Sequence, residues 1–156
     1  MRVSQSFSIV VRPRHGWVAS DFHRICNGKG AIVTVVKSSG GYIFGGYTDV
    51  AWRGGDGQYQ SSTESFMFSV KDHAGVGPVQ MPIKSEMTGY AVIHASFLGP
   101  TFGSGYDLRV QSNANANSTS NSSAYDAYQL PSNTSDPYFL TGTEDFTVSE
   151  YEVFLV

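Results

Sequence analysis

Cys26 is the one cysteine in this chain and the residue best suited to nucleophilic or redox chemistry. A short helix is expected to end here, and the negative end of a helix dipole raises the pKa of a thiol. His23 and Arg24 lie close enough in sequence to act in the opposite direction. A packing cysteine is the favoured interpretation, and a peroxide-reactive thiol is the alternative. A lone cysteine excludes an intramolecular disulfide and a cysteine-based zinc site.

The histidines show no metal-binding or catalytic spacing, because neither an HxH nor an HExxH pattern occurs. They are His15, His23, His73 and His94. His94 lies in an apolar segment, where a hydrogen-bonded histidine within a sheet is the simplest interpretation. The sequence also contains no GxSxG nucleophile elbow.

Several carboxylates are candidates for polar contacts or for glycosidase-type chemistry. Glu150 and Glu152 are two residues apart in an expected strand and therefore share one face. Like charges placed in this way repel, so this face is expected to be solvated or to meet a cation. Glu64 and the pair Glu144-Asp145 are further candidates. None of these is specific, so the residues alone show no recognisable catalytic constellation.

An Asn/Ser-rich segment at residues 112–123 supplies many oxygen atoms. Together with flanking carboxylates it offers a set of potential calcium ligands, which does not match the EF-hand pattern. These residues are Asp107, Asn113, Asn115, Asn117 and Asp126. A solvated loop with Asx turns is the favoured interpretation. The glycine-rich stretch 99–105 lacks the lysine of a P-loop and is predicted to be a turn.

Length and charge restrict the classes of function. The 156 residues fit one domain, and a formal charge of −3 argues against a general nucleic-acid binder. No apolar run approaches the length of a membrane-spanning helix, and no signal peptide is evident. We therefore expect an intracellular, cytoplasmic protein.

Strand-like segments dominate the chain. Residues 31–37 are mostly β-branched and are predicted to form a strand buried on both faces. A hairpin loop at 38–41 leads to a strand at 42–47, in which Gly45-Gly46 indicates a bulge or a close backbone approach. Further strands are expected at 65–70, 90–97 and 146–156, the last with a bulge near residues 149–150. The fold class is therefore mostly β, with two antiparallel sheets packed as a sandwich.

One short helix is expected before the first of these strands. Phe22, Ile25 and Cys26 share a helical face, and Asn27-Gly28 ends the helix. Ser20 or Asp21 is predicted to cap its N-terminus, with Val18 as a hydrophobic staple. The segment 112–123 is predicted to be a polar loop that contains no core strand.

Five segments, taken in order, resemble the TLDc domain of the oxidation-resistance proteins. They are residues 14–30 (RHGWVASDFHRICNGKG), 34–47 (TVVKSSGGYIFGGY), 62–68 (STESFMF), 99–108 (GPTFGSGYDL), and 144–154, which runs from EDF to EYEVF. The resemblance covers residues 7–156 and implies a two-sheet sandwich with a few short helices. We therefore expect one TLDc-like domain over residues 1–156, without the helical lead-in that many such domains have.

The resemblance also implies a non-enzymatic role, for which we expect no cofactor and no metal. Family members protect cells against oxidative damage, and several bind the vacuolar proton pump (V-ATPase) and regulate its assembly. The positions that match the family's motifs are Gly45, Gly46, Glu64, Gly103, Asp107, Glu150 and Glu152. The glycines are expected to be structural. The carboxylates are expected to form a contact patch for a basic partner or internal salt bridges, with internal pairing favoured for Glu64.

The leading hypothesis is thus a protein-interaction domain in oxidative-stress defence that binds peripheral V-ATPase subunits. Two alternatives remain open at the level of sequence. One is direct peroxide consumption by Cys26. The other is a module in which the Asn/Ser segment, with Asp107 and Asp126, binds calcium or a glycan.

Overall fold

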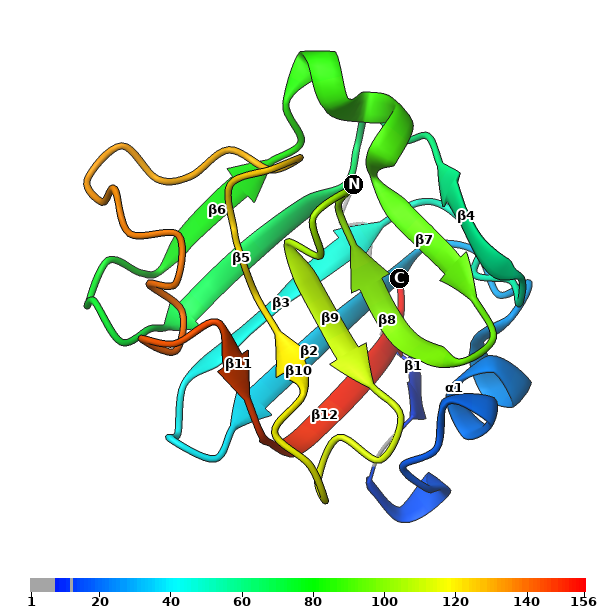
Figure 1. Cartoon of the computed structure of the whole chain (residues 1–156). Coiled ribbons are helices and arrows are strands. Elements are labelled where there is room, and N and C mark those ends of the chain that lie inside the picture. Colours follow the sequence, from blue (N-terminus) through cyan, green and yellow to red (C-terminus); the bar gives the residue numbers. More distant parts are fainter. Residues whose placement is uncertain (1–7, 12) are drawn as a thin grey trace, which may run out of the picture.

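The expected β-sandwich is present in the computed structural model, which describes residues 8–11 and 13–156. Its two sheets lie face to face, as Figure 1 shows, and each has six strands in this part of the chain. The first sheet has the order β1-β12-β2-β3-β5-β6 and the second the order β11-β10-β9-β8-β7-β4. All strand pairs are antiparallel.

The strand boundaries follow the chain through both sheets. The first sheet contains β1 (Ser8–Val11), β2 (Ile32–Ser38), β3 (Ile43–Thr48), β5 (Phe66–Lys71), β6 (Val79–Pro82) and β12 (Val148–Leu155). The second contains β4 (Asp56–Gln60), β7 (Val92–Ala95), β8 (Leu98–Phe102), β9 (Leu108–Gln111), β10 (Ser120–Asn121) and β11 (Asp145–Phe146). A register shift between Val148 and Glu150 confirms the bulge expected in the last strand.

One buried core joins the two sheets. Ile32, Val36 and Phe44 of the first sheet pack in the same cluster as Phe102 and Leu108 of the second. Strand β2 does not have two buried faces as predicted, because Val33 and Val35 are only half-buried. Alternation along the strand therefore separates a core face from an outer face.

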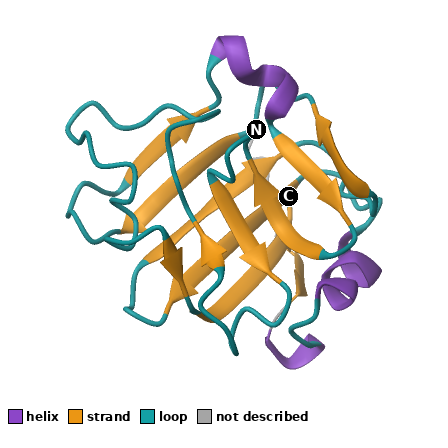
Figure 2. Ribbon diagram, in the orientation of Figure 1, coloured by secondary structure: helices purple, strands orange, loops and turns teal. Residues whose placement is uncertain are grey.

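The helices lie at the rim of the sandwich, as Figure 2 shows. They are η1 (Pro13–His15), α1 (Ala19–Cys26) and η2 (Ser85–Tyr90). The predicted cap of α1 is wrong: the N-cap is Val18, which makes no side-chain cap and is too exposed to be a staple. The amide of Ala19 instead donates a hydrogen bond to Ser112 Oγ at 2.9 Å. This cap comes from the Asn/Ser segment, so local sequence did not reveal it.

Gly45 and Gly46 allow two close approaches to β3, as predicted, although no bulge falls between them. A Cβ on Gly45 would meet the Thr34 carbonyl and the ring of Phe68, which lies on the outer face. A Cβ on Gly46 would meet the Phe102 ring of the second sheet at 2.7–3.0 Å. One glycine therefore accommodates packing outside the sheet, and the other accommodates packing between the sheets.

Two expected loops contain strands instead. Residues 98–102 form β8, whose side chains are all buried, so only the end of the glycine-rich stretch is a turn. The strand expected at 90–97 correspondingly shortens to β7 and turns back into β8. In the Asn/Ser segment, Ser120 and Asn121 form β10 and are buried. The prediction that this segment holds no core strand is wrong, because strand pairing and burial here depend on β9 and β11.

Candidate functional site

The outer face of the first sheet carries rows of cross-strand neighbours. Val33, Tyr47 and Phe66 are opposite one another on β2, β3 and β5, and the Tyr47 and Phe66 rings stack with centroids 5.1 Å apart. In the next row, Val35 and Phe68 lie on either side of Gly45. We define the outer face as these half-buried side chains together with Ile43 and Phe154. Its members are Val33, Val35, Ile43, Tyr47, Phe66, Phe68 and Phe154.

Three of the candidate carboxylates, namely Glu64, Glu150 and Glu152, border this outer face. Glu150 and Glu152 lie opposite Lys37 and Val35 in the register of β12 and β2, which confirms that they share one face. Together with Ile43, these residues line a depression of about 140 Å³. Burial, and the nearby carboxylates of Asp49 and Glu64, raise the pKa of the Tyr47 hydroxyl. Glu64 therefore lies at the other end of the same face.

Among the described residues, Glu64 forms no internal ion pair, contrary to the pairing that was favoured for it. Its side chain is exposed, and within the described residues its carboxylate accepts one hydrogen bond, from the neighbouring Thr63 hydroxyl at 3.3 Å. The residue before a buried strand need not be buried itself, because the Ser62 hydroxyl accepts the amides of Glu64 and Ser65 and so organises the turn. The carboxylate is left to the solvent or to a partner.

Asp107 is fully buried and cannot belong to a surface patch. Its carboxylate accepts hydrogen bonds from the amides of Ala127 and Tyr128 at 3.0–3.1 Å. Burial raises the pKa of this carboxyl to about 7, although these two hydrogen bonds favour the charged form. Gly103, with a φ of +83°, leaves the space that the carboxylate occupies. Asp107 therefore ties the loop after β8 to the segment near Tyr128.

Cys26 is also fully buried, in the core between α1 and the sheets. Burial raises the pKa of its thiol to about 12, and the nearby Lys29 only partly offsets this effect. Reaction with peroxide requires an accessible thiolate. This position therefore favours packing over peroxide chemistry.

The hydrogen bonding predicted for His94 is found at His23 instead. Both His23 and His94 are buried. His23 Nε2 lies 2.8 Å from the carbonyl oxygens of Ala95 and Leu98, to which it donates. His94, expected to be hydrogen-bonded, packs near the Trp52 ring, and its Nε2 has no hydrogen-bond partner in the described part of the chain. Burial lowers the pKa of His94.

Part of the Asn/Ser segment uses its polar groups internally. Asn117 donates to the carbonyls of Ser112 and Asn113 and accepts from both the amide and the hydroxyl of Thr119. Among residues 8–11 and 13–156, no group of three or more His, Cys, Asp or Glu is placed to hold a metal ion. With Asp107 buried and Asn117 occupied, the arrangement offers little to calcium.

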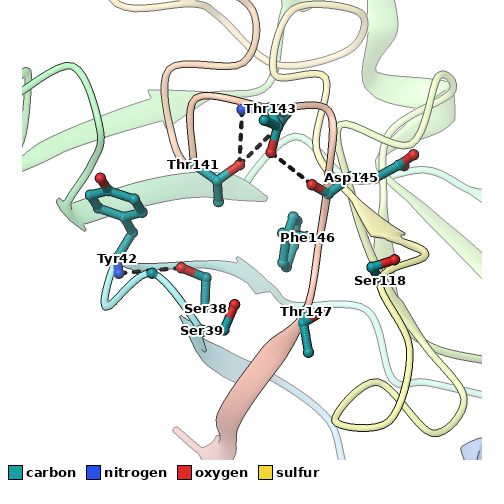
Figure 3. Close-up of a pocket in the computed structure, with 10 residues that line it drawn as sticks. Ser38, Ser39, Tyr42, Ser118, Thr141, Thr143, Asp145, Phe146 and Thr147 are labelled. Atoms are coloured by element: carbon teal, nitrogen blue, oxygen red, sulfur yellow. Dashed lines mark hydrogen bonds between the residues drawn. The ribbon is translucent and has the colours of Figure 1, made fainter.

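A pocket of about 330 Å³ is a further candidate that the sequence did not reveal. Figure 3 shows three segments meeting there: the β2–β3 hairpin, the Asn/Ser segment through Ser118, and the stretch leading into β12. Hydroxyl groups line most of it. The lining residues are Ser38, Ser39, Gly40, Tyr42, Ser118, Thr141, Thr143, Asp145, Phe146 and Thr147.

Comparison with known families gives one match. The family model of the TLDc domain matches residues 5–156, which is almost the whole chain. No curated protein matches the chain. None of the described helices is long and apolar enough to cross a membrane.

Proposed function

Because the chain belongs to the TLDc domain family, we propose that it is a non-catalytic protein-interaction domain in the defence against oxidative stress. We further propose that it acts by binding peripheral subunits of V-ATPase. A cytoplasmic location is part of this proposal. V-ATPase is proposed as the partner because the chain resembles the family, and the binding role is supported by the surface described above.

The observation that supports binding is the apolar outer face of the first sheet. Valine and aromatic side chains are half-buried there, and the rings of Tyr47 and Phe66 stack on each other. An apolar patch with a polar rim is typical of surfaces that bind other proteins.

Charges at the rim indicate the chemistry of the partner. Glu64 and Asp49 lie near the hydroxyl of Tyr47, and Glu150 lies on β12. Lys37 and Lys71 lie opposite Ile43 at the hairpin end of the same sheet. A partner segment with an apolar stripe and basic residues towards the carboxylates is therefore complementary to this face.

An affinity purification from a eukaryotic lysate tests the proposal, with this domain as bait and mass spectrometry as readout. Three baits are compared: the native domain, Glu64→Lys/Glu150→Lys on the outer face, and Glu86→Lys/Glu144→Lys elsewhere. Each variant replaces two glutamates by lysines, so the two variants have the same net charge. All four carboxylates are exposed, so we expect both variants to fold like the native domain. Circular dichroism checks the fold of each bait.

We expect the native domain and the second variant to enrich V-ATPase subunits, and the outer-face variant to lose them. Absence of pump subunits with the native bait would contradict the proposed partner. Equal enrichment by all three baits would leave the partner standing and contradict the proposed surface.

A further inference from the structure

We propose that the pocket in Figure 3 binds a neutral carbohydrate, an activity separate from the pump-binding role and independent of it. The volume of about 330 Å³ falls at the small end of ligand sites and suits one or two sugar rings. Some of the polar groups that line the pocket are hydrogen-bonded within the protein, and others are not.

Several polar groups of the pocket have no partner within the described residues. The hydroxyls of Ser39, Ser118 and Thr147 make no hydrogen bond there, and neither does the carboxylate of Asp145. Each hydroxyl can both donate and accept, and the carboxylate accepts from two donors. A ligand rich in hydroxyl groups matches this combination, since each of its hydroxyls also donates and accepts.

The remaining polar groups hold the walls in place. Thr141 Oγ1 donates to the Thr143 carbonyl, and Thr143 Oγ1 donates to the Asp145 carbonyl, both at 2.7 Å. Across the pocket, the amide of Ser39 donates to the Thr147 carbonyl at 2.9 Å. Figure 3 shows these bonds within the 141–145 turn. A site fixed in this way loses little conformational entropy when a ligand binds.

Two aromatic residues supply apolar surface between the hydroxyls. Phe146 lies among them in Figure 3, and its ring meets Phe44 edge-on at 5.3 Å. The Tyr42 ring likewise meets the His73 ring edge-on, with their centroids 5.7 Å apart. A sugar ring has C–H faces as well as hydroxyl edges, so apolar and polar walls are both used.

The charge of the pocket selects against other small ligands. Of the described residues that line it, Asp145 is the single charged one, and none is a lysine, arginine or histidine. A phosphorylated or carboxylated ligand would therefore be repelled. One carboxylate is also too few for a stable calcium site, which takes six to eight oxygen ligands.

The test is a titration of the whole domain, labelled with nitrogen-15, followed by amide chemical shifts. The probes are glucose, galactose, mannose, N-acetylglucosamine and their common disaccharides, each up to roughly 10 mM, which covers weak single-site affinities. We expect saturable shifts confined to residues 38–42, 118 and 141–147 with at least one probe. Shifts that do not saturate with any probe, or that lie elsewhere, would overturn the proposal.

Matched variants identify the groups responsible. Asp145→Asn removes the charge and one acceptor site, so we expect affinity to fall roughly tenfold. Glu144→Gln changes the neighbouring carboxylate, which does not line the pocket, and should leave affinity unchanged. The 6-phosphate of the best monosaccharide, or of the monosaccharide unit of the best disaccharide, should bind more weakly than the neutral sugar. Equal affinity of the two variants, or tighter binding of the phosphate, would contradict the assignment.

Discussion

At the scale of single residues, burial decides which candidate groups can act. Asp107 and Cys26 both have the residue type for chemistry, but both are fully buried. The carboxyl and the thiol therefore favour their uncharged forms, and each has a strongly raised pKa. Glu64 and Glu150 remain exposed and charged. The residue types could be read from the sequence. Their burial could not, because it depends on how the two sheets pack together.

Asp107 should make the stability of the domain depend on pH. Its pKa is raised from 3.8 to about 7, so the folded state binds a proton that the unfolded state has released. The stabilising contribution is complete below pH 3.8 and is lost as pH rises through about 7. We expect the free energy of unfolding, measured with urea between pH 5 and about 8, to fall by a few kcal/mol.

The variant Asp107→Asn retains an oxygen that can accept the Ala127 and Tyr128 amides but does not titrate. Its unfolding free energy should be much less sensitive to pH, whereas Asp145→Asn, which changes an exposed carboxylate, should behave like the native domain. An unchanged pH slope in Asp107→Asn would show that another group is responsible.

Cys26 should be unreactive in the folded domain. Its thiol is buried and its pKa is about 12, so both access and thiolate formation are suppressed. We expect no reaction with Ellman's reagent at pH 8 until urea unfolds the chain, and no change in peroxide consumption in Cys26→Ser. As a control, Ser20→Cys introduces an exposed thiol on the same helix and should react at once. Rapid labelling of Cys26 in the native state would restore the peroxide hypothesis.

At the scale of elements, hydrophobic pattern predicted some of the strands that form the core, but it missed the buried β8 and the strands defined by their neighbours. The β-branched segment of β2 and the bulged β12 were identified from sequence. The polar β4 and the two-residue β10 carry no such pattern, because they form by pairing with β7, β9 and β11. The hydroxyl pocket was missed for a related reason: its serines and threonines come from three distant segments.

Gly46 should be essential to the contact between the sheets. A Cβ there would meet the Phe102 ring at 2.7–3.0 Å, so Gly46→Ala should destabilise the domain by about 1–3 kcal/mol. Denaturant unfolding measures this, and Phe102→Leu in the same chain should recover part of the loss. Gly89→Ala serves as the control, since nothing lies within 4 Å of a Cβ at that position. Additive effects of the two substitutions would refute the steric explanation.

At the scale of the whole molecule, one core spans both sheets. Side chains from each sheet and from α1 belong to a single buried cluster, with Trp52 inside it. A shared core means that neither sheet buries its apolar face without the other.

The domain should therefore unfold in one transition. Trp17 and Trp52 are its two tryptophans, and the Trp52 ring packs edge-on against Phe22 of α1 and Phe102 of β8. We expect tryptophan fluorescence and far-ultraviolet circular dichroism to give the same urea midpoint. Fluorescence that changes at lower urea than the dichroism would mean that the two sheets separate before they unfold.

The position of β12 has a consequence for folding during translation. Among the described strands, β12 is the last to leave the ribosome, yet it lies between β1 and β2, which leave before the others. Until residues 148–155 emerge, β1 lacks its partner and the edge of β2 is open, without Tyr151 and Val153 to complete the core. Open β-edges of this kind invite aggregation. Folding of this sandwich must therefore wait until β12 has been synthesised, and the nascent chain needs protection until then.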